Sequence, residues 1–242
     1  MFMDMNYIDD IKEYEEWVTN FRSIVQEKGK YPDRLARELD SYFIYKNLDI
    51  GYNDKVLEFG CGFSYPYIYF SKFCEEFILS DDFSWCKRDY AIKDKLDPNT
   101  VITEAKKHFN VKPMQFSATK IPFPDNYFDK VYSISVMEHI EKDSKVMDEV
   151  YRVLKPGGKF VFTTEVNIFI GMKYKPLYFL RVYSLSELLM LGKSANFKMV
   201  NVLDTTRLSP EIIEKMRGAI FAPDQLIHPY KHFISAGMVL KK

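Results

Sequence analysis

The segment Lys55–Phe59 (KVLEF), followed at once by Gly60-Cys61-Gly62, most constrains what this chain can fold into. A short, largely apolar run of this length favours a buried strand. Two glycines directly after it allow a sharp turn and a close approach of the backbone to a ligand. Residues 66–74 are typical of a helix, whose first amide groups would be free to donate. The segment therefore predicts a strand, a glycine turn and a helix, an arrangement that can bind a ligand at a sheet edge.

Strands and helices are predicted to alternate along the rest of the chain. This alternation favours one mostly parallel sheet that is covered by helices on both faces. We expect a helical cap over residues 1–50 and a ligand-binding domain over residues 51–242. The expected strands lie at 77–80, 114–116, 130–135, 159–164, 198–203 and 233–240, and the expected helices at 7–28, after Asp33, at 100–109, 142–154 and 185–194.

Charge and cysteine content exclude several classes of protein. The 34 Lys and Arg residues balance the 34 Asp and Glu residues, so no overall positive field would hold a nucleic acid. Cys61, Cys74 and Cys86 show no CxxC spacing, which argues against a disulfide framework and a structural zinc site. No apolar run approaches the ~18 residues of a membrane span, and the acidic segment MFMDMNYIDDIKEYEEW lacks the apolar stretch expected of a signal peptide. We expect a cytoplasmic protein that acts on a small-molecule partner, with no nucleic acid and no membrane.

Acidic side chains accompany the glycine turn. Glu58 stands two residues before the first glycine, and Asp81-Asp82 ends the next predicted strand, roughly 20 residues after the turn. In a doubly wound fold, a carboxylate at the tip of the second strand can accept hydrogen bonds from the two hydroxyls of a ribose. The combination predicts a nucleoside-binding site.

Four blocks of this sequence resemble the class I S-adenosylmethionine-dependent methyltransferases, in the order and spacing of that family. They are VLEFGCGFS, ILSDDFS, ATKIPFPDNYFDKVYSISVMEHI and DEVYRVLKPGGKFVFTT. The resemblance covers residues 55–165 well and 180–203 loosely. It implies an α/β fold with a doubly wound, seven-stranded, mostly parallel sheet whose last strand pair is antiparallel. It also implies methylation of an O, N or C atom of a small molecule or glycan precursor, with S-adenosylhomocysteine as the product.

The resemblance also implies which residues contact the cofactor. Glu58 would face the ammonium group of the methionine moiety. Either Asp82, which fits a D-x-S pattern, or Asp81, which fits the strand length better, would hold the ribose. Ser117 would flank the adenine where the family usually has Asp, and a neutral acceptor makes a weaker contact than a carboxylate. The full set of expected contacts is Glu58, Phe59, Gly60, Cys61, Gly62, Asp81, Asp82, Phe83, Ser117, Ala118, Thr119, Ser135, Val136 and Met137.

His139, with Glu138 beside it, is the candidate catalytic residue. A histidine suits proton removal from a hydroxyl or amine acceptor near neutral pH. The alternative, given equal weight, is that His139 has a structural role in its loop. No metal site is expected, because no further ligand pattern accompanies the pair. Residues outside the resemblance are expected to line the acceptor pocket: Trp85, Arg88, Tyr90, Tyr174, Tyr178 and Arg181.

Two other functions fit parts of the pattern. A nicotinamide-dependent oxidoreductase also uses a glycine turn, but Glu58 and the Pro156-Gly157-Gly158 block count against it. A protein that binds the cofactor without catalysis would tolerate Ser64 and Ser117 in place of the usual Gly and Asp. Cofactor binding and turnover measurements distinguish these alternatives.

Overall fold

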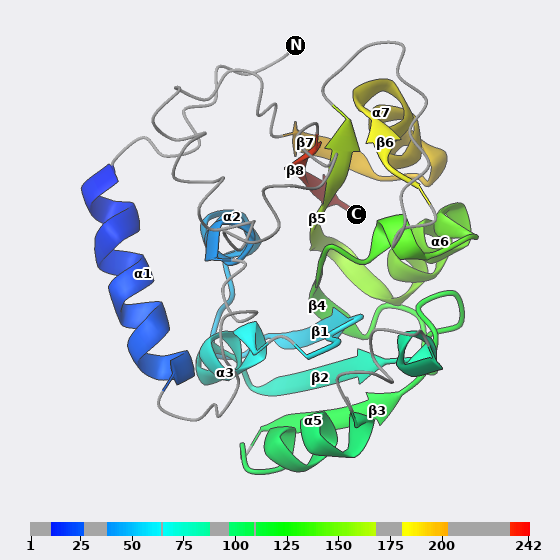
Figure 1. Ribbon diagram of the computed structural model, residues 1–242. Helices are drawn as coiled ribbons and strands as arrows, with labels where there is room; N and C mark the ends of the chain where they lie inside the picture. The colour runs from blue at the N-terminus through cyan, green and yellow to red at the C-terminus, as the bar shows by residue number, and fades with distance from the viewer. Residues whose placement is uncertain are drawn as a thin grey trace.

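The computed structural model describes residues 11–26, 38–63, 65–87, 97–108, 110–167, 181–202 and 233–242. At its centre is a twisted sheet of eight strands, in which the arrowheads of β2 and β3 point to the same side (Figure 1). The strands are β1 (Lys55–Phe59), β2 (Glu76–Asp81), β3 (Val111–Gln115), β4 (Phe128–Ile134), β5 (Leu154–Asn167), β6 (Tyr183–Ser184), β7 (Lys198–Val202) and β8 (Phe233–Lys241).

The strand order is β3-β2-β1-β4-β5-β8-β7, and the two-residue strand β6 pairs with the end of β5. Strands β1 to β5 pair in parallel, whereas β8 is antiparallel to both β5 and β7. The order of the strands in the sheet reverses between β1 and β4. At such a point a doubly wound fold leaves room for a ligand outside the carboxyl ends of the strands. The predicted fold is confirmed, with one short strand more than expected.

Helices cover both faces of the sheet. The α-helices are α1 (Ile11–Gln26), α2 (Glu38–Leu48), α3 (Pro66–Phe70), α5 (Pro98–Ala105), α6 (Asp143–Val153) and α7 (Leu185–Ser194), and the 3₁₀ helices are η1 (Ser71–Phe73), η2 (Ser84–Lys87) and η3 (Met137–His139). Helices α1 and α2 lie on the left of Figure 1, and α6 and α7 on the right. Both helices predicted before β1 are present, and α2 packs directly on β4, β5 and β8.

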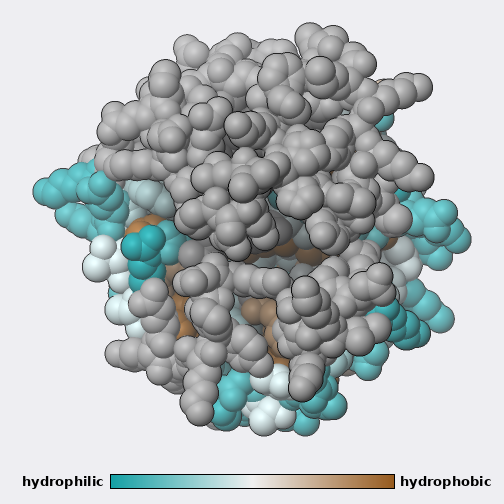
Figure 2. All heavy atoms as spheres, viewed as in Figure 1, coloured by the Kyte–Doolittle hydropathy of each residue, from teal (hydrophilic) through white to brown (hydrophobic). Residues whose placement is uncertain are grey.

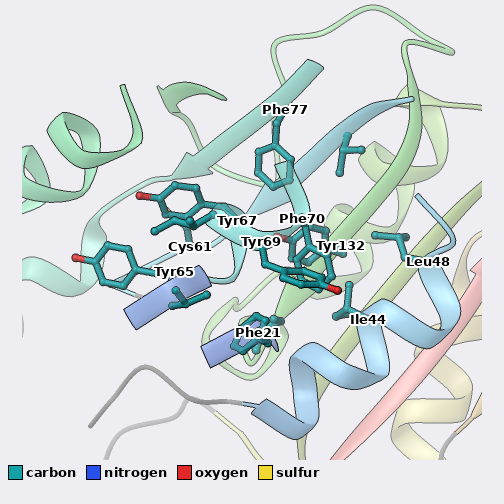
Figure 3. Close-up of a cluster of buried hydrophobic side chains, with 14 of the residues drawn as sticks. Phe21, Ile44, Leu48, Cys61, Tyr65, Tyr67, Tyr69, Phe70, Phe77 and Tyr132 are labelled. Atoms are coloured by element: carbon teal, nitrogen blue, oxygen red, sulfur yellow. The ribbon is translucent and has the colours of Figure 1, made fainter. Parts of the chain in front are cut away.

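Two hydrophobic clusters separate the helices from the sheet. The first joins α1, α2, α3 and α5 to one face. The rings of Phe70 on α3 and Tyr132 on β4 meet with centroids 5.3 Å apart, and Figure 3 shows Phe21 and Ile44 in the same cluster. The second joins α6 and α7 to the other face through residues such as Phe160. Neighbouring residues of a strand alternate between the two clusters, as the pleat of a strand requires.

Two predicted strand boundaries were wrong. Strand β5 begins at Leu154, before the Pro156-Gly157-Gly158 turn that was expected to precede it, because Leu154 already pairs with Phe128 and the register shifts across the glycines. A Cβ on Gly158 would lie 2.9 Å from the carbonyl oxygen of Asp129, so this close approach of β4 requires glycine. Strand β3 begins at Val111 and contains a proline, which its place at the edge of the sheet permits.

Figure 2 shows hydrophilic residues at the left and right margins of the face seen in Figure 1, with hydrophobic residues toward the middle. In the described part of the chain, every helix is too short or too polar to cross a membrane.

Candidate functional site

The glycine turn is fixed to the tip of β2 by backbone hydrogen bonds. Gly60 and Cys61 donate from their amides to the carbonyl oxygen of Ser80, over 2.7 and 3.1 Å. Gly60 and Gly62 have φ angles of +74° and +52°, which favour glycine. A Cβ on Gly62 would meet no atom of the described residues within 4 Å, so the turn faces open space there. The turn therefore has the room that a closely approaching ligand needs.

The two aspartates after the turn have different surroundings. Asp81 is 5% exposed, and both of its carboxylate oxygens accept hydrogen bonds from the chain. Asp82 is exposed, and its Oδ1 accepts a hydrogen bond from the amide of Ser84 over 2.8 Å. Burial raises the pKa of Asp81 above its ordinary value, and amides of Phe83 and Gly62 oppose that rise. Asp82 is therefore the more accessible of the two carboxylates at the tip of β2.

The segment after β3 forms a compact turn next to the end of β2. The amide of Phe116 donates to the carbonyl oxygen of Asp81 over 3.2 Å, which ties the two strand ends together. Ser117 Oγ lies 2.9 Å from Thr119 Oγ1, and Ala118 is buried in the second cluster. Ser117 and Thr119 are half-buried and follow shortly after the end of β3, which places them near the carboxyl end of the sheet.

The end of β4 packs against the glycine turn. Ser135 has a φ angle of +49°, which bends the chain after the strand. A Cβ on Gly60 would lie 2.4 Å from Cγ2 of Val136, so the turn and the end of β4 are in direct contact through this glycine. The 3₁₀ helix η3 follows, in which the amide of His139 donates to the carbonyl oxygen of Val136 over 2.9 Å.

Glu58 is buried beneath the turn. Its side chain is 1% exposed and accepts a hydrogen bond from the hydroxyl of Tyr132 on β4. Burial raises the pKa of Glu58 to about 8; the hydrogen bond from Tyr132 opposes the rise and the charge of Asp81 adds to it. The carboxyl group faces the helical layer of α1, α2 and α3, because Tyr132 belongs to that cluster.

The two residues of the predicted catalytic pair differ in burial. Glu138 is completely buried, and its Oε2 accepts a hydrogen bond from Thr164 Oγ1 over 2.8 Å. A direct contact between Glu138 and an acceptor would require its surroundings to move. His139 is half-buried and closer to the surface. Of the pair, His139 is therefore the residue that a proton-bearing acceptor can reach more readily.

Two residues predicted to line an acceptor pocket are engaged elsewhere. The indole Nε1 of Trp85 donates to Asp81 Oδ1 over 3.1 Å, on the side of the expected cofactor contacts. Arg181 is held by the Asp143 carboxylate and by the carbonyl oxygen of Glu141 at the start of α6. Arg88, Tyr90, Tyr174 and Tyr178 lie outside the described residues.

Sequence reasoning missed two polar residues of the site. Tyr132 was expected only as part of a strand, although the alternation in KVYSISV already places it on the opposite face from Val131. Glu165 near the end of β5 is 7% exposed and accepts a hydrogen bond from Ser135 Oγ over 3.5 Å. An acidic residue directly after a predicted buried strand was the signal available for Glu165.

A family model described as "Methyltransferase domain" matches residues 57–162, which include the glycine turn, both aspartates and the ends of β4 and β5. Residues 57–162 of the chain therefore form a methyltransferase domain. Within this methyltransferase domain lie all of the residues that were predicted from the resemblance to contact the cofactor.

A curated relative of the methyltransferase domain is the sterol 24-C-methyltransferase erg-4 of Neurospora crassa. It is 31% identical over 160 residues, which cover 64% of this chain and 38% of the relative. The match thus spans about two fifths of the length of the curated relatives.

Solved structures share the fold of the methyltransferase domain. Phosphoethanolamine N-methyltransferase 2 of Haemonchus contortus, in complex with S-adenosyl-L-methionine, has a TM-score of 0.63 at 16% identity and covers 98% of this chain and 59% of its own. The [4+2]-cyclase SpnF also has a TM-score of 0.63 at 16% identity, and covers 96% of this chain and 94% of its own. At such identities the likeness shows the fold alone.

Proposed function

We propose that this protein is an enzyme that transfers a methyl group from S-adenosylmethionine to a small-molecule acceptor. One observation carries this proposal: the glycine turn, the exposed Asp82 and the Ser117–Thr119 turn meet at the carboxyl ends of three adjacent parallel strands. Their order along the chain is that of the family whose model matches residues 57–162.

The residues at this edge fit the cofactor. Among the described residues the space over Gly62 is open, and it would accommodate the close approach of the methionine moiety, whereas a side chain at this position would fill it. Asp82 offers an exposed carboxylate for the two ribose hydroxyls, whereas the oxygens of Asp81 are already engaged within the chain. Ser117–Thr119 would flank the adenine. We therefore assign the ribose to Asp82 rather than to Asp81.

The bound cofactor would supply a methyl carbon activated by a positive sulfonium. An acceptor lone pair or π pair would form a bond to that carbon, and the electron pair of the broken carbon–sulfur bond would return to sulfur. The chain has to align the acceptor and exclude water, effects worth up to about 7–11 kcal/mol. We propose that half-buried His139 takes the proton that an O–H or N–H acceptor loses, or that the cation left by methylation of an alkene loses.

The sterol methyltransferase relative favours carbon as the methylated atom and an apolar molecule as the acceptor. The balance of 34 basic and 34 acidic residues agrees with a neutral acceptor rather than a nucleic acid. We propose that the enzyme acts in the cytoplasm.

Calorimetry with S-adenosylmethionine, S-adenosylhomocysteine and NAD tests the cofactor. We expect binding of the first two and not of NAD. Incubation with a set of sterols, quinones and other apolar alkenes, followed by measurement of released S-adenosylhomocysteine, then tests turnover. Binding without release on any acceptor would favour a non-catalytic binding protein, and heat with NAD alone would favour an oxidoreductase.

A further inference from the structure

Asp81 joins two segments that would lie on either side of the cofactor. Its Oδ2 accepts a hydrogen bond from the amide of Gly62 in the glycine turn, over 2.8 Å. Its Oδ1 accepts from the amide of Phe83 over 2.6 Å and from Trp85 Nε1 over 3.1 Å. One buried carboxylate thus accepts three hydrogen bonds, from the turn after β1 and from the segment after β2.

Aromatic rings reinforce this connection. The rings of Phe63 and Trp85 meet edge to face, with centroids 4.7 Å apart, and Phe83 lies 6.2 Å from Trp85. Phe83 has a φ angle of +54°, a conformation that side-chain-bearing residues rarely adopt. The bond from its amide to Asp81 Oδ1 holds this bend. The bend follows directly after Asp82 in the chain.

We propose that Asp81 and Trp85 are positioning residues: Asp81 binds no part of the cofactor but holds the glycine turn and the Asp82 segment at the separation that the nucleoside requires. This inference rests on the proposed cofactor. Trp85 acts through Asp81, by completing the set of donors around its carboxylate, and so belongs to the cofactor side of the site rather than to an acceptor pocket.

The chemistry of the donors supports this role. Hydrogen bonds to a charged group are roughly twice as strong as neutral ones, so three donors compensate a buried carboxylate. Three donors already occupy most of the roughly four acceptor positions of the Asp81 carboxylate, so it could accept from both ribose hydroxyls only by giving up a bond that shapes the site. The exposed Asp82 needs no such exchange.

Asp81→Asn and Trp85→Phe test the proposal, alone and together, with calorimetric affinity for S-adenosylhomocysteine as the readout. Asn keeps the shape of Asp but turns one acceptor into a donor that faces an amide. Phe keeps the ring contact with Phe63 but removes Nε1. We expect Asp81→Asn to weaken binding by about tenfold or more and Trp85→Phe by about threefold. Trp85→Phe should add no further loss in the Asp81→Asn background.

Asp148→Asn is the matched control, because Asp148 is an exposed aspartate on α6. It should bind as the wild type does. Affinity within twofold of wild type for both Asp81→Asn and Trp85→Phe would overturn the proposal, as would fully additive losses in the double variant. If Asp81→Asn does not fold, Trp85→Phe alone decides by the same affinity measurement.

Amide hydrogen exchange of the ligand-free protein provides a readout that does not depend on the cofactor. We expect the amides of Gly62 and Phe83 to exchange slowly in the wild type and faster in Asp81→Asn, while the amides of β4 keep their protection. Unchanged exchange at Gly62 would contradict the role of Asp81. A wild type that binds no S-adenosylhomocysteine but shows this exchange pattern would instead contradict the proposed function and leave the connection made by Asp81 in place.

Discussion

At the scale of single residues, the site contains three carboxylates that differ in burial and in hydrogen bonding. Glu58 is enclosed and bonded to Tyr132, Asp81 is enclosed and bonded to three donors, and Asp82 is exposed. Asp81 is the last residue of β2 and Asp82 the first beyond it, and neighbouring residues at a strand end point to opposite sides. The sequence showed three acids near a glycine turn, and only the structure separates their roles.

Glu58 should make the stability of the fold depend on pH. Its pKa is about 8 in the folded chain against an ordinary value of 4.5. Between these values the unfolded chain has lost the proton while the folded chain keeps it, so stability falls as pH rises, by up to about 1.4 kcal/mol per pH unit. Below the lower value and above the higher one, Glu58 contributes no pH dependence.

Urea unfolding of the wild type and of Glu58→Gln between pH 5 and 9 measures this effect. The Gln amide oxygen can still accept the hydrogen bond from Tyr132, but the side chain does not titrate. We expect the difference in unfolding free energy between the two proteins to grow in favour of Glu58→Gln as pH rises. Parallel curves for the two proteins would show that Glu58 is not the group responsible.

Asp82 should contribute to cofactor affinity directly. Replacement by Asn leaves one neutral acceptor for two ribose hydroxyls, and a lost charge-assisted hydrogen bond costs about 1.5–3 kcal/mol. We expect S-adenosylhomocysteine to bind about ten- to a hundredfold more weakly to Asp82→Asn. Calorimetry measures the loss, and the exposed Asp148→Asn serves as the control. Equal affinity of Asp82→Asn and wild type would contradict the assignment of the ribose contact to Asp82.

At the scale of elements, helix α6 holds the loop that precedes β4. The guanidinium of Arg152 donates to the Glu149 carboxylate and to the carbonyl oxygens of Ile121 and Phe123, over 2.8 to 2.9 Å. It also forms an ion pair with Asp125 over 2.9 Å. Glu149 in turn accepts a hydrogen bond from the amide of Ile121. The arginine of the YRVLKPGG block is therefore a structural residue that fixes a loop.

Arg152→Lys should destabilise the fold without a matching effect on the cofactor. Lysine keeps the charge but lacks the planar set of donors that reaches several carbonyl oxygens at once. We expect a loss of about 2 kcal/mol in unfolding free energy, measured by urea titration. Affinity for S-adenosylhomocysteine should change by less than about threefold, since the loop lies outside the expected contacts. A large loss of affinity with unchanged stability would contradict the structural role of Arg152.

The sequence predicted elements better than contacts. Strands β1, β2 and β4 and the glycine turn follow from local patterns of apolar residues and glycines. The bond between Tyr132 and Glu58, 74 residues apart, depends on strand pairing that no local pattern contains. The same holds for the pairing of Arg181 with Asp143 across 38 residues.

At the scale of the whole molecule, an N-terminal helix packs against the last strand of the sheet. Helix α2 packs on β8, the last strand, and Phe43 lies directly over Gly237. A Cβ on Gly237 would lie 2.3 Å from Cε1 of the Phe43 ring. The N-terminal cap therefore depends on the absence of a side chain near the C-terminus, a requirement that neither segment shows in its own sequence.

Gly237→Ala should destabilise the protein, and a smaller residue at position 43 should restore part of the loss. Overpacking of a well-packed core costs about 1–3 kcal/mol, and we expect a value in this range from urea unfolding. Phe43→Leu alone should also destabilise, because it leaves a cavity over the glycine. In the double variant the added methyl group occupies that cavity. The loss of unfolding free energy in the double variant should therefore be smaller than the sum of the two single losses. If the loss in the double variant equals the sum of the two single losses, Phe43 and Gly237 do not interact energetically. Helix α2 would then be stabilised by its other contacts alone.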